Sequence, residues 1–83
     1  MTLIPTEVIC HAGYKAEEYP LHFLGMDGWV EVAEVVDRWY QGTRHPEWPE
    51  SDYFRVRGDD DELHLLKHDR EHNQWYLAAG DLV

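Results

Sequence analysis

Short runs in which apolar and polar residues alternate recur along the chain, with turn-forming residues between them. Successive side chains of a strand point to opposite faces, so this alternation predicts half-buried strands. The runs cover residues 6–11, 19–24, 53–57, 63–68 and 74–77. With their mostly short connections, they predict an all-β protein: a small antiparallel meander or SH3-like barrel of about five to six strands.

The longest apolar-patterned segment, residues 23–40, follows this alternation only in part. It contains Asp27-Gly28, a pair that favours a tight hairpin turn, and it is then rich in Val and Trp. The alternation slips near Ala33 and Glu34, where one extra residue, a β-bulge, would restore it and bend the strand. The segment therefore predicts a long bent central strand. The alternative is an α+β protein with a short helix at residues 33–40, because the same apolar residues also fall at helical spacing.

The length of 83 residues predicts a single domain, residues 1–83, because a second core is hard to build in so short a chain. Residues 41–52 follow neither period and contain Pro46 and Pro49, which predicts a long loop. Trp48 lies between these prolines, where it would either cover an open end of the core or contact a partner. We expect residues 78–83 to form a loose tail.

The chain is acidic, with 7 Lys and Arg, 17 Asp and Glu and a formal net charge of −10. A surface of this sign repels phosphate groups, so we expect neither nucleic acid nor a membrane as a partner. A basic protein remains electrostatically allowed as a partner. No apolar run approaches the roughly 20 residues of a spanning helix, and the first residues lack the pattern of a secretion signal. A cytoplasmic location is therefore expected.

One cysteine and six histidines raise the question of a metal or catalytic site. Cys10 and His11 point to opposite faces of a strand, and a lone cysteine between such neighbours is typical of a small core residue. His64 and His68 lie about 13 Å apart on an extended strand, too far to share one ion. The acidic run at residues 58–62 predicts a solvated turn. We therefore expect no catalytic residue, no metal and no cofactor, and we do not expect an enzyme.

The run at residues 63–68 is apolar on both faces, so its orientation stays open. Leu66 shares one face with His64 and His68, whereas Leu63 and Leu65 share the other. If Leu66 points inward, both histidines become partly buried and need hydrogen-bond partners.

Residues spread over most of the chain carry a resemblance to known proteins. They are Cys10, His11, Gly13, Tyr14, Lys15, Pro20, Phe23, Gly28, Val32, Val35, Val36, Trp39, Tyr53, Phe54, Val56, His68, Asp69, Trp75 and Leu77. In these residues the chain resembles a family of short uncharacterised bacterial proteins, defined only as a domain of unknown function. Members of a group similar to this family are encoded near error-prone polymerase accessory genes. Most of these positions are packing and turn residues, so the resemblance implies a fold and no particular chemistry.

Taken together, the pattern and the charge favour a non-enzymatic protein-interaction module. Its protein partner is unknown and is either basic or a second copy of the chain. Aromatic residues such as Trp48 would provide the contact. The alternative is a ligand- or metal-binding domain that uses Cys10, His11, Tyr14 and His68.

Overall fold

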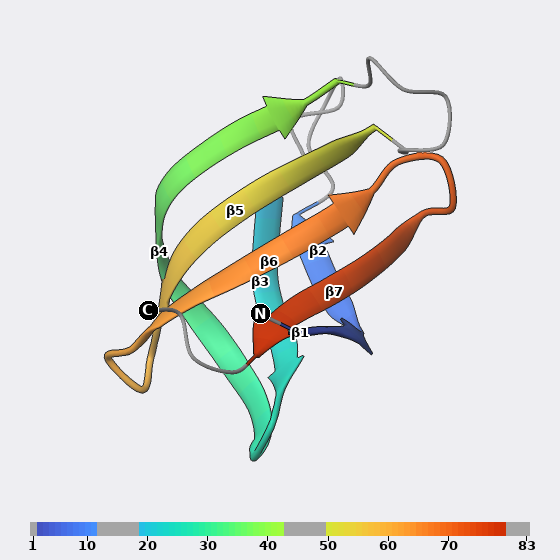
Figure 1. Cartoon of the computed structure of the whole chain (residues 1–83). Helices are drawn as coiled ribbons and strands as arrows, with labels where there is room; N and C mark the ends of the chain where they lie inside the picture. Colours follow the sequence, from blue (N-terminus) through green and yellow to red (C-terminus); the bar gives the residue numbers. More distant parts are fainter. Residues whose placement is uncertain (1, 12–18, 43–49, 80–83) are drawn as a thin grey trace.

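A computed structural model describes residues 2–11, 19–42 and 50–79, which form seven strands and no helix. Figure 1 shows the strands in chain order. They are β1 (Thr2–Thr6), β2 (Val8–His11), β3 (Tyr19–Gly25), β4 (Gly28–Gln41), β5 (Ser51–Gly58), β6 (Leu63–Asp69) and β7 (Gln74–Ala79). Within these residues no helix is long and apolar enough to cross a membrane. The prediction of an all-β antiparallel fold is therefore confirmed.

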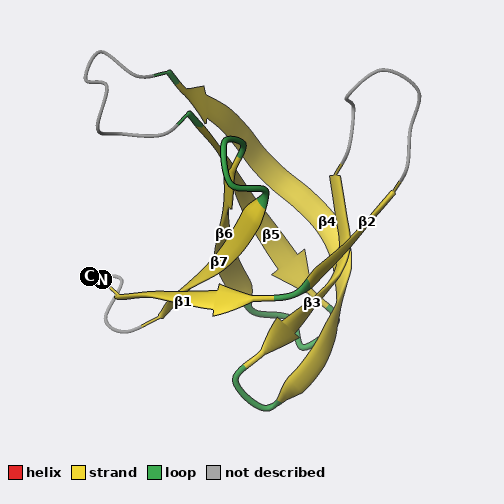
Figure 2. Cartoon of the chain, turned by 90° about the vertical axis from the view of Figure 1, so that its right-hand side faces the viewer, coloured by secondary structure: helices red, strands yellow, loops and turns green. Residues whose placement is uncertain are grey.

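The strands form one sheet in the order β1-β7-β6-β5-β4-β3-β2, with every neighbouring pair antiparallel. β1 and β2 lie at opposite ends of this order, although only Glu7 separates them in the sequence. The sheet must therefore curl until its two ends approach each other, which gives the half-barrel of Figure 2. The Leu24 backbone N–H donates to the Glu7 carbonyl at 2.9 Å and ties this junction to β3.

β4 is the long bent strand predicted for the centre of the chain. Its first residues, up to Glu31, pair with β3, and from Val32 onward it pairs with β5. The register with β5 shifts between Val32 and Glu34, which confirms the predicted bulge, and shifts again between Val35 and Asp37. The alternative of a short helix at residues 33–40 is wrong. The bulge resets the alternation, so apolar residues fall at helical spacing on a strand.

Three boundaries differ from the sequence prediction. The strand count is seven instead of five to six, because Thr2–Thr6 forms an additional edge strand against β7. Both ends of the loop predicted at residues 41–52 belong to strands, since Gln41 ends β4 and Ser51 begins β5. Residues 43–49 of this predicted loop lie outside the described residues. The tail predicted from residue 78 is wrong for its first two residues, because β7 continues to Ala79 and pairs there with Thr2. The rest of the predicted tail lies outside the described residues.

The core lies on the concave side of the sheet. Its buried side chains are Phe23, Phe54, Val56, Leu66 and Leu77. Leu66 sits directly between Phe54 of β5 and Leu77 of β7 in the strand register. Leu66 is fully buried, whereas Leu63 on the other face of β6 is 58% exposed. The orientation left open by the sequence is thus settled, and His64 and His68 lie on the core side.

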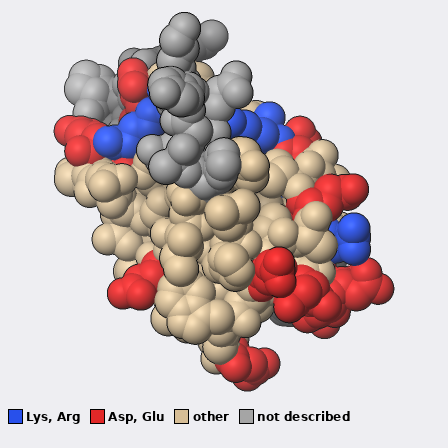
Figure 3. Space-filling model, turned by 180° about the vertical axis from the view of Figure 1, so that it is seen from behind, with Lys and Arg blue, Asp and Glu red and all other residues tan. Residues whose placement is uncertain are grey.

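The outer face of β2, β3 and the start of β4 carries exposed apolar residues. Val8 and Val30 pair with the buried Phe23 and face inward, so their neighbours Ile9, Leu24 and Trp29 face outward. Ile9 is 53% and Trp29 50% exposed. We call these three outward side chains the apolar face. On the side that carries β2 and β3, a broad area without charged side chains has Asp and Glu along much of its margin (Figure 3).

Candidate functional site

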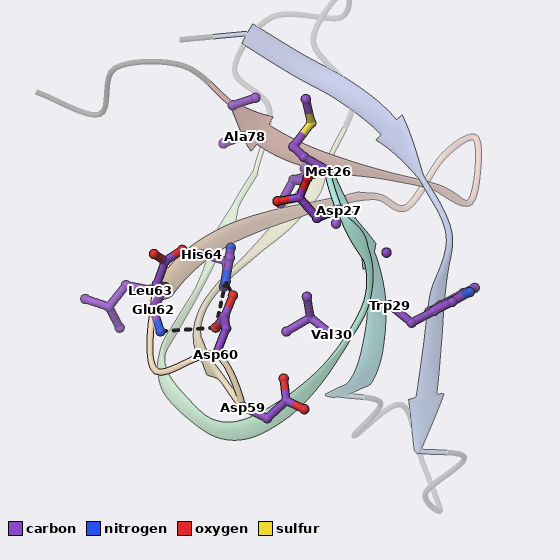
Figure 4. Close-up of a pocket in the computed structure, with 14 residues that line it drawn as sticks. Met26, Asp27, Trp29, Val30, Asp59, Asp60, Glu62, Leu63, His64 and Ala78 are labelled. Carbon is purple, nitrogen blue, oxygen red and sulfur yellow. Dashed lines mark hydrogen bonds and ion pairs between the residues drawn. The ribbon is translucent and has the colours of Figure 1, made fainter.

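An open pocket of about 700 Å³ lies at one end of the half-barrel (Figure 4). Three segments frame it: the turn between β3 and β4, the turn between β5 and β6, and the end of β7. Val30 and Leu77 supply apolar lining, and Asp59, Asp60 and His64 form a polar wall. The mouth of a barrel is a common position for ligand pockets, so we call this the mouth pocket and treat it as the candidate site.

The turn between β5 and β6 positions the polar wall. The backbone N–H of Asp61 donates to the Gly58 carbonyl, and that of Gly58 donates to the Glu62 carbonyl, both at 3.0 Å. Asp61 adopts a φ of 62°, in the left-handed region, which Asp tolerates better than most residues. A Cβ on Gly58 would lie 2.6 Å from Asp60 Oδ1 and 2.6 Å from Val30 Cγ1. The close approach of these two side chains therefore requires glycine.

Asp60 and His64 form a hydrogen-bonded pair in this wall. His64 Nε2 lies 3.0 Å from Asp60 Oδ2 and 3.3 Å from Oδ1. The His64 side chain is only 18% exposed, and its ring packs edge-on against Phe23 with the centroids 4.9 Å apart. The backbone N–H of Glu62 donates to Asp60 Oδ1 and lowers the pKa of Asp60, and His64 adds to this effect against that of partial burial. The carboxylate is thus held ionised beside the imidazole.

Glu62 brings a third metal-ligating group to the same place. One donor atom each from Asp60, Glu62 and His64 lies within 4.8 Å of the other two. The sequence pattern alone did not bring these three residues together, because the acidic run predicted a solvated turn. The signal was the spacing of two between the three positions, with Asp60 and Glu62 in the turn just before β6 and His64 near the start of that strand.

Of the candidates predicted from the sequence, Cys10 and His68 both lie near Asn73 and Trp75. Cys10 is partly buried in β2 and lines a second pocket with Asn73 and Trp75. His68 Nε2 lies 2.9 Å from Asn73 Oδ1, and its ring stacks on Trp75 with the centroids 4.4 Å apart. Neither Cys10 nor His68 belongs to the metal-ligating cluster of Asp60, Glu62 and His64 that is found within the described ranges. His68 thus has a hydrogen-bond partner, as expected for a histidine that shares a face with the inward-pointing Leu66.

The other three candidates are not placed. Tyr14 and Trp48 lie outside the described residues, and so does the side chain of His11, whose backbone ends β2. Their proposed roles stay predictions.

Trp39 and Tyr53 lie together on the outer face of β4 and β5. Their rings stack with the centroids 5.3 Å apart and the planes 6° apart. The Arg55 guanidinium lies 5.9 Å from the Trp39 ring centroid, and Lys67 Nζ lies 5.9 Å from that of Tyr53. These rings contact each other and lie close to two cations.

The opposite end of the half-barrel holds a structural ion pair. Arg70, in the turn after β6, donates from Nε to Asp52 Oδ2 at 2.7 Å and from Nη2 to Oδ1 at 2.9 Å. The Asp52 side chain is only 8% exposed. The Arg70 guanidinium also lies 4.6 Å from the Tyr40 ring centroid. The two hydrogen bonds raise the pKa of Arg70, and the arrangement fastens the β6–β7 turn to the start of β5.

Comparisons with known proteins returned no match. No family model, no curated protein and no solved structure matches the chain. The resemblance to the bacterial family of unknown function therefore stays a prediction, and the functional argument depends on the geometry.

Proposed function

We propose that the protein is a non-enzymatic interaction module that binds a basic protein partner through its apolar face. The observation that carries this proposal is the joint exposure of Ile9, Leu24 and Trp29 on one side of the sheet. Ile9 and Trp29 also line the same pocket, so they lie close together. An exposed Trp beside aliphatic residues is the composition of an interface anchor.

The charge of the chain supports a basic partner. The formal net charge is −10. Glu31 of β4 lies opposite His22 of β3 in the strand register, on the outer surface that also carries the apolar face. A partner with Lys and Arg around an apolar centre would be attracted by this surface and oriented on it. A second copy of the chain carries the same net charge, so mutual repulsion disfavours self-association.

The described lining of the mouth pocket offers no nucleophile of the Ser, Cys, Thr or Lys type. Its described lining contains carboxylates, an imidazole and apolar groups, and none of these lining residues offers a hydroxyl, thiol or amino group. Nucleophilic catalysis by Ser, Cys, Thr or Lys would need such a group beside His64.

The proposal can be tested with defined peptides and the ¹⁵N-labelled chain. One peptide combines Lys and Arg with Leu and Phe, a second has the same charge without apolar residues, and a third is acidic. We expect salt-sensitive shifts at Ile9, Leu24 and Trp29 with the first peptide, weaker effects with the second and none with the third.

Trp29→Ala should weaken binding of the first peptide by at least about tenfold, as expected for an interface anchor. Leu63→Ala is the matched control, because Leu63 is similarly exposed on a different part of the sheet. Equal losses in both variants, or shifts away from the apolar face, would refute the proposal. A dimer observed by sedimentation equilibrium would indicate that the partner is a second copy of the chain and would contradict the proposal of a basic partner.

A further inference from the structure

We propose that Asp60, Glu62 and His64 form a binding site for a divalent first-row transition-metal ion of the Zn²⁺ type. The site lies in the wall of the mouth pocket, which Trp29 of the apolar face also lines, but it shares no residue with that face (Figure 4). None of its three residues belongs to the metal-binding alternative predicted from the sequence, which used Cys10, His11, Tyr14 and His68. It also does not depend on the proposed partner, so the two proposals can fail separately.

The spacing of the donor atoms fits a single ion. Bonds from Zn²⁺ to carboxylate oxygen or imidazole nitrogen are about 2.1 Å long, so neighbouring ligands stand about 3.0–3.4 Å apart. His64 Nε2 and Asp60 Oδ2 are already 3.0 Å apart. All three donor atoms lie within 4.8 Å of one another, and Glu62 is an exposed residue with room to move closer. Small side-chain rotations would complete the coordination.

The chemistry of the donors selects the class of ion. One imidazole and two carboxylates suit Zn²⁺ and its first-row neighbours, whereas Ca²⁺ prefers six to eight oxygen ligands and Mg²⁺ retains most of its water. Two carboxylates also neutralise the charge of a divalent ion. Asp27 and Asp59 line the same pocket and add negative potential around it.

Two of the ligands are oriented before an ion arrives. The Glu62 backbone N–H holds Asp60, and the Phe23 ring limits rotation of the partly buried His64. On binding, the ion would take the place of the proton between His64 Nε2 and the Asp60 carboxylate. The neutral imidazole would then carry its proton on Nδ1, and water from the open pocket would complete the coordination.

The test uses the 83-residue chain without an affinity tag, after treatment with EDTA. Titration with ZnCl₂ in a calorimeter should show one site, and NMR should show shifts centred on the His64 imidazole and on Asp60 and Glu62. Asp60→Asn, Glu62→Gln and His64→Ala should each weaken binding by at least about tenfold, because each removes a direct ligand. MgCl₂ and CaCl₂ should bind at least about tenfold more weakly than ZnCl₂.

Asp61→Asn is the matched control within the same turn. Asp61 lies next to two of the ligands but pairs with Arg57, with Arg57 Nη1 3.6 Å from Asp61 Oδ1, and Asn tolerates its positive φ. This variant should bind Zn²⁺ within about threefold of the wild type. The fold of Glu62→Gln should be intact, because the turn uses the backbone groups of Glu62.

Three results would overturn the proposal. The first is the absence of heat and of chemical-shift change with millimolar ZnCl₂. The second is a set of shifts centred on other histidines, such as His68 or His72. The third is an equal loss of affinity in Asp60→Asn and Asp61→Asn, which would indicate attraction to the general negative charge of the turn.

Discussion

The orientation of β6 determines where His64 and His68 lie, and a pair of leucine substitutions on this strand tests it. Leu66→Ala removes a fully buried side chain between Phe54 and Leu77, whereas Leu63→Ala truncates a side chain that is 58% exposed. Both changes remove the same atoms from the same strand. The difference between the two variants therefore reports the difference in burial.

The expected magnitudes are well separated. Truncation of a buried leucine costs about 2.7–5 kcal/mol, because contacts are lost and a cavity remains. At roughly 0.05–0.15 kcal/mol per residue, a protein of this length has a total stability of about 4–12 kcal/mol, so Leu66→Ala removes a large part of it. The melting temperature should fall by more than about 10 °C, at about 4–8 °C per kcal/mol. Leu63→Ala should change the stability by less than about 0.5 kcal/mol.

Urea unfolding followed by tryptophan fluorescence provides the measurement. The Leu66→Ala midpoint should fall sharply with an unchanged slope, and the Leu63→Ala midpoint should stay near that of the wild type. If Leu63→Ala costs as much as Leu66→Ala, the face assignment of β6 is wrong. His64 would then not lie on the core side against Phe23, and the proposed metal site would lose its oriented imidazole.

Three further predictions concern the turns at the two ends of the half-barrel. Gly58→Ala should destabilise the protein by about 1–3 kcal/mol, since the new Cβ would overlap neighbouring atoms only 2.6 Å away; an unchanged melting temperature would contradict this close packing. Asp52→Asn should cost about 1–2 kcal/mol by chemical denaturation, because the buried side chain accepts two hydrogen bonds from the half-exposed Arg70. A double-mutant cycle with Arg70→Met that shows no coupling energy would contradict the ion pair. The hydrogen bond to the Asp69 carboxylate raises the pKa of His72 above its usual 6.5. The pKa of Asp69 itself is lowered below its usual 3.8, because burial, which raises it, is outweighed by the hydrogen bonds and the charge of His72. The ion pair therefore stabilises the fold below about pH 6.5, as long as Asp69 stays ionised, and this effect is lost as the pH rises through the folded-state pKa of His72. The stability advantage of the wild type over His72→Gln should accordingly shrink as the pH rises above about 6.5. An NMR titration midpoint of His72 at or below 6.5 would contradict this.

Much of the secondary structure followed from local patterns in the sequence. Asp27-Gly28 marked a hairpin turn in which Gly28 has a φ of 125°, and the slip at Ala33 marked the bulge of β4. β1 was missed because its five residues include Pro5 and acquire strand geometry only by pairing with β7, about seventy positions later in the chain. A local window contains no information about such a partner.

The sequence by itself determined an acidic all-β chain with a long bent strand and a turn at its acidic run. Tertiary structure alone decided which face of β6 is buried, because Leu63, Leu65 and Leu66 are all apolar and alternation does not choose between them. The choice was made by Phe54 and Leu77, which strands β5 and β7 place on either side of Leu66. The same packing turns His64 toward the core, where the β5–β6 turn brings Asp60 and Glu62 within reach of its imidazole.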